Sequence, residues 1–107
     1  MLRQILVVAS LVATAPALAQ DADFTLDIRD HRFEPAELRV PAGKKIRLTV
    51  RNNDDTPEEF ESHPLNREKV VPGKGKVLIY IGPLAAGRYP FFGEFNPKTA
   101  IGTIVAE

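Results

Sequence analysis

The sequence contains no cysteine, and its single methionine is Met1. Without cysteine the fold can hold no disulfide bond, so packing and hydrogen bonds alone must stabilise it. A thiolate metal ligand is excluded as well, and with it ordinary blue-copper electron transfer, which needs a cysteine sulfur. The lack of methionine after the first residue also argues against a Cu⁺ site, because Cu⁺ prefers thiolate and thioether ligands.

Neither sign of charge dominates, and long apolar runs are missing after the N-terminus. The chain has 14 basic and 14 acidic residues and a formal net charge of zero, whereas nucleic acid is usually bound by a clearly basic surface. The length of 107 residues allows one domain. We therefore expect a single domain that binds no nucleic acid and that meets a membrane only through a partner protein.

The N-terminal segment has the features of a secretory signal peptide. Arg3 precedes an apolar run over 5–18, and Ala17-Leu18-Ala19 supplies the small residues of a cleavage site. We expect residues 1–19 to be a cleaved signal peptide and residues 20–107 to be a periplasmic domain. The alternative is a membrane anchor, but the run is shorter than the roughly 20 residues that a helical span needs.

Alternating apolar and polar residues predict short β-strands in the rest of the chain. Phe24, Leu26 and Ile28, for example, share one face of the segment 23–29. Clusters of turn-forming residues such as 52–57 recur roughly every 8–12 residues, and we find no convincing helical periodicity. We expect an all-β fold, a Greek-key antiparallel β-sandwich or barrel of about seven strands. Local pattern alone does not separate an immunoglobulin-like sandwich from other folds of this class.

Three stretches resemble the cupredoxin family. FEPAELRVPAGKKIRLTVRNND (33–54) is similar to the family's opening pattern and to the strand that leads to its first metal ligand. TPEEFES (56–62) lies where a blue-copper member typically has Pro-His, so Glu58 takes the position of the first His ligand. The end of the chain resembles the family's strand, metal-binding loop and closing strand, but Gly93 stands where the copper-binding Cys would be. The resemblance implies a cupredoxin fold that lacks the blue-copper cysteine.

A narrower resemblance concerns the E-x-E pair and the loop sequence FFGEF-x-P-x-T-A-x-G. Together they are similar to cupredoxin-like periplasmic components of bacterial iron-uptake systems built around a high-affinity iron permease. The matching residues are Glu59, Glu61 and loop residues including Gly93 and Glu94. Asn96 stands where related sequences often have His, which leaves open whether this position still offers a ligand. The resemblance implies a protein that binds copper or iron and assists ferrous iron uptake, by iron oxidation or by delivery to the permease.

The candidate metal ligands are Glu59, Glu61, Glu94 and His63. Glu59 and Glu61 are two residues apart on a predicted strand, so they project from one face. The resemblance brings the loop with Glu94 near them, and His63 follows the acidic strand directly. An oxygen-rich site suits iron or manganese, and an added imidazole also suits Cu²⁺. The alternative is that Glu58, Glu59 and Glu61 are simply a solvated strand face.

The direction of Phe60 decides what kind of site this is. If Phe60 points into the core, Glu59 and Glu61 point out of it, and the site lies on the surface. Such a site suits transient metal transfer better than a permanently held cofactor. We expect Phe91 in the core and His31 in a turn with local hydrogen bonds.

The sequence therefore predicts a periplasmic metal-binding protein with copper or iron as its cofactor. Its expected partners are an iron permease and other periplasmic iron-uptake components. An accessory ferroxidase activity and a homodimer both remain open. The alternative function is a metal-free β-sandwich that binds another protein.

Overall fold

The computed structural model describes residues 3–11 and 21–107. Residues 3–11 form no regular secondary structure, and their large apolar side chains are exposed. The expected cleavage point after Ala19 lies outside the described residues, so the signal peptide stays a prediction. No helix in the part of the chain that the structure describes is long and apolar enough to span a membrane.

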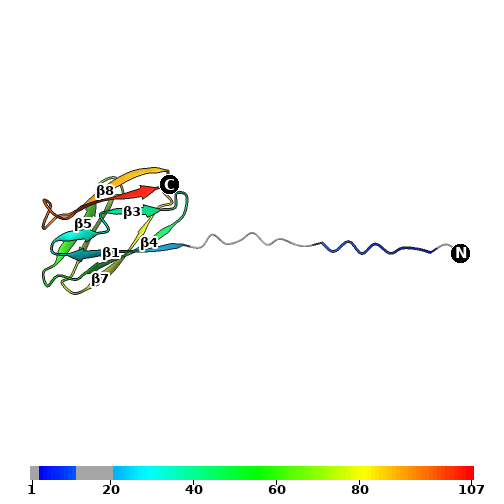
Figure 1. The fold of residues 1–107 in the computed structure, drawn as a ribbon, viewed down its shortest axis with the longest axis horizontal. Helices are drawn as coiled ribbons and strands as arrows, with labels where there is room; N and C mark the ends of the chain where they lie inside the picture. The colour runs from blue at the N-terminus through cyan, green and yellow to red at the C-terminus, as the bar shows by residue number, and fades with distance from the viewer. Residues whose placement is uncertain (1–2, 12–20) are drawn as a thin grey trace.

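In the described part of the chain, nine strands form two sheets. The two sheets pack as a sandwich (Figure 1). The first sheet has the order β2-β1-β4-β7, with β1 at Ala22–Arg29, β2 at Arg32–Glu34, β4 at Ile46–Asn52 and β7 at Lys76–Ile81. The second has the order β3-β9-β8-β5-β6, with β3 at Glu37–Val40, β5 at Glu58–Ser62, β6 at Arg67–Val71, β8 at Gly87–Gly93 and β9 at Ile101–Ala106.

The predicted all-β sandwich is confirmed, and three details differ from the expectation. The described residues form nine strands, where about seven were expected. The segment 30–35, expected as a turn only, contains the short strand β2, because Asp30 and His31 reverse the chain with φ of 52° and 57°. Their backbone N–H groups donate hydrogen bonds to the carboxylate of Asp54, which holds this reversal in place. His31 is therefore a turn residue as expected, but its hydrogen bonds are not local, because Asp54 lies 23 residues further along the chain. In addition, two pairs are parallel, β1 with β4 and β3 with β9, because the chain visits the other sheet between them.

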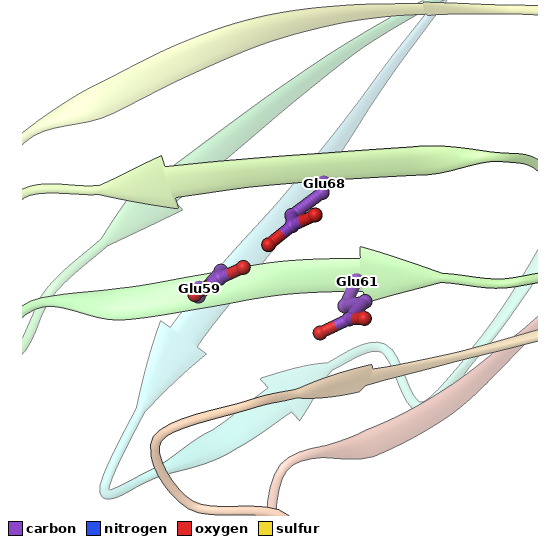
Figure 2. Close-up of side chains that lie close together, drawn as sticks. All are labelled: Glu59, Glu61 and Glu68. Carbon is purple, nitrogen blue, oxygen red and sulfur yellow. The ribbon is translucent and has the colours of Figure 1, made fainter.

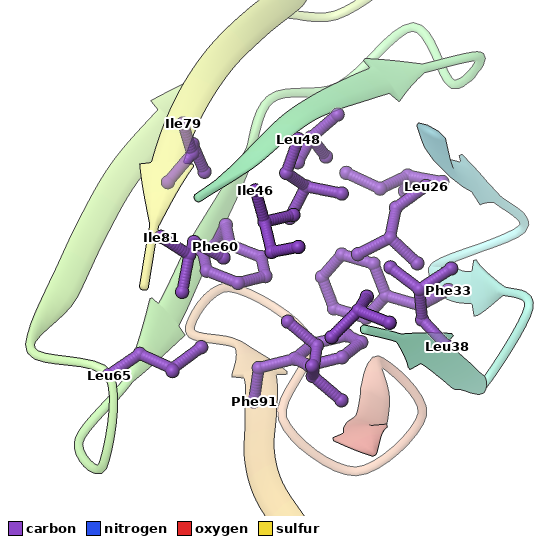
Figure 3. Close-up of a cluster of buried hydrophobic side chains, with 14 of the residues drawn as sticks. Leu26, Phe33, Leu38, Ile46, Leu48, Phe60, Leu65, Ile79, Ile81 and Phe91 are labelled. Carbon is purple, nitrogen blue, oxygen red and sulfur yellow. The ribbon is translucent and has the colours of Figure 1, made fainter. Parts of the chain in front are cut away.

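Three phenylalanines pack together between the two sheets (Figure 3). Phe33 comes from the first sheet, and Phe60 and Phe91 come from the second. Phe60 and Phe91 stack with ring centroids 5.2 Å apart, and Phe33 meets the Phe91 ring edge-on at 4.9 Å. All three are at most 3% exposed, which confirms Phe91 as a core residue. Aromatic pairs of this geometry add about 0.5–1.5 kcal/mol beyond area burial. The core thus fixes the direction of β5, which carries Glu59 and Glu61, and of β8, which leads into the loop with Glu94.

The outer face of the second sheet carries a row of four cross-strand neighbours. Glu68 on β6 pairs with Glu61 on β5, Glu61 with Phe92 on β8, and Phe92 with Ile101 on β9. Residues directly opposite one another project from the same face. This row is therefore acidic at the β6 end and apolar at the β9 end, where Ile101 is 57% exposed.

Candidate metal site

Strand β5 separates its glutamates between two faces of the sheet. Phe60 points into the core and is fully buried, so Glu59 and Glu61 project outward (Figure 2). The expected outward direction of these two side chains is confirmed. Glu58 and Ser62, in contrast, alternate with Glu59 and Glu61 onto the inner face, and each is only 1% exposed.

A third glutamate joins the outward pair. Carboxylate oxygens of Glu59, Glu61 and Glu68 all lie within 4.8 Å of one another (Figure 2). We call these three residues the acidic cluster. Sequence reasoning missed Glu68. The signal that could have found it is the short connection at 63–66, which follows the acidic strand and joins β5 to β6. Two adjacent strands joined by a short loop form a hairpin, and its register sets Glu68 opposite Glu61.

Mutual repulsion and loss of hydration change the acidity of the cluster. The pKa of Glu59 is raised to about 7, first through the neighbouring Glu68 carboxyl group, which can share a proton with it, and then through reduced hydration. The pKa of Glu61 is also raised, here mainly by reduced hydration and next by the Glu94 carboxyl group. Only 9% of the Glu59 residue is exposed, and the hydrogen-bond partner of its carboxyl group is the carboxyl group of Glu68. The metal-free cluster therefore relieves its negative charge by retaining a proton, which a bound cation would displace.

The other two predicted ligands lie beside the cluster. The backbone N–H of Glu94 donates to the carbonyl oxygen of Glu59 at 2.9 Å, and the Glu94 side chain acts on the pKa of Glu61. His63 lines a polar hollow together with Glu61 and Glu68, and its ring lies 5.6 Å from that of Phe92. The structure thus gathers Glu59 and Glu61 with Glu68, and it sets Glu94 and His63 around them. Whether these residues bind a metal stays a prediction.

The inward-facing Glu58 has partners of its own. Its two carboxylate oxygens accept hydrogen bonds from the backbone N–H of Phe95 at 2.8 Å, the side-chain amide of Asn96 at 2.6 Å and the backbone N–H of Glu59 at 3.0 Å. Glu58 is therefore not part of a solvated face, and it does not reach the acidic cluster. Its contacts instead join β5 to the loop at 93–100.

Comparison with known proteins agrees with this architecture. Residues 2–106 match the Cupredoxin-like domain family. An uncharacterised protein of Rickettsia prowazekii (strain Madrid E) is 48% identical over 80 residues, which cover 75% of this chain and 64% of that protein, so the chain spans just under two thirds of its length.

Two solved structures illustrate the likeness of fold. Auracyanin A, a "blue" copper protein from Chloroflexus aurantiacus, has a TM-score of 0.70 and 14% identity, with 82% of this chain and 100% of that chain covered. A purple cupredoxin from Nitrosopumilus maritimus has a TM-score of 0.60 and 16% identity, with 80% and 99% covered. At such low identity these likenesses concern the fold alone.

The residues at the position of a blue-copper centre do not fit such a centre. Gly93 has no side chain where the thiolate is required, and Asn96 offers an amide that is already bonded to Glu58. Glu58, at the position of the first His ligand, uses both its oxygens in hydrogen bonds. These three positions therefore lack the soft and imidazole ligands that blue copper needs.

Proposed function

The chain belongs to the cupredoxin-like domain family, and from that premise we propose that it is a periplasmic metal-binding protein that assists ferrous iron uptake. The metal is held on the outer face of the second sheet, at Glu59, Glu61 and Glu68, with Glu94 and His63 at the rim. The protein delivers its metal to an iron permease or to another periplasmic component of the uptake system.

The observation that carries this proposal is the close approach of the three carboxylates in the acidic cluster. They meet within 4.8 Å, and the pKa of the most enclosed of them, Glu59, is raised to about 7. Like charges at this distance are stable only when a proton, water or a cation lies among them. A cation would satisfy all three carboxylates at once, which supports metal binding over a merely solvated strand face.

The ligand chemistry favours hard cations. Carboxylate oxygens suit iron and manganese, and the nearby imidazole of His63 extends the range to Cu²⁺. Copper is also the metal named for related folds, such as auracyanin A. The sequence has neither Cys nor any Met beyond Met1, so Cu⁺ is the least suited of these ions.

The role in iron uptake is supported by the E-x-E pair and the 93–100 loop, which resemble components of iron-permease systems. The position of the cluster on the outer face of the sheet suits this role, because a metal held there can pass to a partner without unfolding of the protein. Copper at the site would extend the role to ferrous iron oxidation.

A metal-resolved thermal shift tests the proposal. The protein would be heated without metal and with Cu²⁺, Fe²⁺ (under anaerobic conditions), Mn²⁺ or Zn²⁺. A ligand at one hundred times its Kd adds about 2.7 kcal/mol, which raises the Tm of a domain this size by several degrees. We expect a selective shift with iron or copper that disappears in the Glu59→Gln/Glu61→Gln variant. The absence of a shift with any metal would contradict the proposal, and a positive result would lead to a ferrous iron oxidation assay.

A second candidate function is supported by the apolar end of the outer face. Ile101 and Phe92 line an open groove together with Pro90 and Pro97, and Phe95 nearby is 49% exposed. Exposed apolar surface of this kind is typical of protein-binding sites. A metal-free protein-interaction module would use this groove alone, and its stability would not respond to metals.

A further inference from the structure

Glu58 is a carboxylate on the inner face of the sandwich, and both of its oxygens accept hydrogen bonds. Its residue is 1% exposed, and three N–H groups donate to its two oxygens. A carboxylate accepts hydrogen bonds and donates none when ionised, so this set of donors matches it. Burying such a group without partners would be costly, and here each partner is within hydrogen-bond distance.

Two of the three donors come from the loop at 93–100. Phe95 contributes its backbone N–H and Asn96 its side-chain amide, although they lie 37 and 38 residues after Glu58. The contact is therefore a tertiary cross-link between β5 and the loop.

The Glu58 carboxyl group also fills the space in front of Gly93. A Cβ atom added at Gly93 would lie 2.6 Å from Cδ of Glu58, 2.8 Å from its Oε1 and 2.7 Å from Cβ of Ala100. Contacts under 3.0 Å are essentially never seen for a real Cβ. The position where the family places a thiolate is thus closed by Glu58 itself.

We propose that the Glu58 carboxylate has the structural role that a copper ion has in a blue-copper centre, as a fixed internal anion that ties the 93–100 loop to β5 and leaves no space for a metal beside Gly93. In a metal centre, one cation draws together ligands from a strand and a loop. Here one anion draws together N–H donors from the same two elements. The central group is therefore negative where a metal centre has a positive ion, and both oxygens of Glu58 are used in hydrogen bonds.

The same cross-link makes Glu58 a positioning residue for Glu94. The loop leaves β8 with the Glu94 N–H bonded to the carbonyl oxygen of Glu59, and the next N–H, of Phe95, is bonded to Glu58. Glu94 is therefore fixed between two anchors and is held beside Glu61. This consequence rests on the proposed cation site, whereas the cross-link itself does not.

Amide hydrogen exchange measured by NMR on the metal-free protein tests the cross-link. Glu58→Leu keeps an enclosed side chain of similar size but removes the acceptor. We expect the Phe95 amide to exchange at least about tenfold faster than in the wild type, since its hydrogen bond to a charged group is lost. Ser62→Ala is the matched control, because Ser62 is equally buried on the same strand but bonds to Pro90 and Leu65 instead of the loop. The Phe95 amide should stay within about threefold of the wild type in that control.

A second variant keeps the test decisive if Glu58→Leu does not fold. Asn96→Asp preserves size but replaces the donor at 2.6 Å by a second carboxylate, so the loop should again exchange faster. Unchanged exchange of the Phe95 amide in the variants that fold would overturn the proposal.

Metal titration separates this proposal from that of the outer site. In a Glu59→Gln/Glu61→Gln/Glu68→Gln background, Mn²⁺ or Cu²⁺ should give no stabilisation, because the inner pocket is closed. Stabilisation that persists in this background and disappears when Glu58→Gln is added would show that Glu58 is itself a ligand, and would overturn the proposal. The exchange measurement needs no metal, so it decides the role of Glu58 even if the outer site binds nothing.

Discussion

The carboxylate of Glu58 and the side-chain amide of Asn96 are joined by a hydrogen bond of 2.6 Å, although 38 residues separate them in the chain. Both stand at positions where the cupredoxin resemblance leads one to expect His. These two side chains therefore bond to each other on the inner side of the second sheet. The carboxylates of the acidic cluster lie on its outer face. The chain thus keeps the cupredoxin-like fold without the ligands of a blue-copper centre.

The first prediction concerns the outward pair. Glu59→Gln/Glu61→Gln should weaken binding of the preferred metal by at least about tenfold, because even indirect neighbours of a metal typically contribute that much to affinity. Folding should persist, since both side chains project from the outer face of β5 and glutamine has nearly the same size as glutamate. Isothermal titration calorimetry measures the affinity, and circular dichroism monitors the fold.

The control for this variant is Asp21→Asn/Asp55→Asn, which removes the same charge from exposed positions away from the acidic cluster. It should bind metal like the wild type. An equal loss of affinity in both double variants would mean that net charge, not a site, attracts the metal.

A second prediction ranks Glu68 above Glu94 as a ligand. Glu68 belongs to the set of carboxylates within 4.8 Å of one another, whereas Glu94 lies outside that set. Glu68→Gln should therefore lower metal affinity by about tenfold, and Glu94→Gln by clearly less. Calorimetric titration of the two single variants at the same pH provides the comparison. The opposite order would place the metal toward the loop, as the sequence resemblance alone suggests.

The route from sequence to site explains why Glu68 was missed. The outward direction of Glu59 and Glu61 could be predicted, because period-two alternation and the need to bury Phe60 leave one face for them. Which residue of β6 lies opposite Glu61 depends on the register of the two strands. That register follows from the hairpin geometry and not from local pattern. The burial of Glu58 was also beyond local reasoning, because its decisive partners, Phe95 and Asn96, belong to a loop far along the chain.

The third prediction is a pH dependence of the metal-free protein. The pKa of Glu59 is about 7 in the folded state against an ordinary 4.5, and that of Glu61 is raised too. Between these values the folded protein keeps a proton that the unfolded chain has lost, so the contribution to stability is complete below about pH 4.5 and is lost as the pH rises through about 7. The Tm should accordingly fall between about pH 5 and about pH 8, and the fall should be smaller in Glu59→Gln.

Thermal unfolding at several pH values, with a chelator present, measures this effect. Asp55→Asn should follow the wild type, because its carboxylate lies outside the cluster. Identical pH profiles for the wild type and Glu59→Gln would argue against mutual repulsion as a cost to the folded protein. Added metal should reduce the slope, since a bound cation favours the ionised carboxylates.

The last prediction concerns the close approach of Gly93 to Glu58. Gly93→Ala would place a Cβ 2.6 Å from Cδ of Glu58 and 2.7 Å from Cβ of Ala100, so Glu58 must shift and strain its hydrogen bonds to the loop. Overpacking of this kind typically costs about 1–3 kcal/mol.

Gly87→Ala on the same strand is the control, because its Cβ would meet nothing closer than 3.7 Å, and its effect should stay within about 0.5 kcal/mol. Urea unfolding of both variants, and of each Gly93 form in a Glu58→Ala background, gives the coupling free energy. The cost of Gly93→Ala should shrink in that background, since only the contact with Ala100 remains. An undiminished cost would assign the tight fit at Gly93 to Ala100 rather than to the carboxylate.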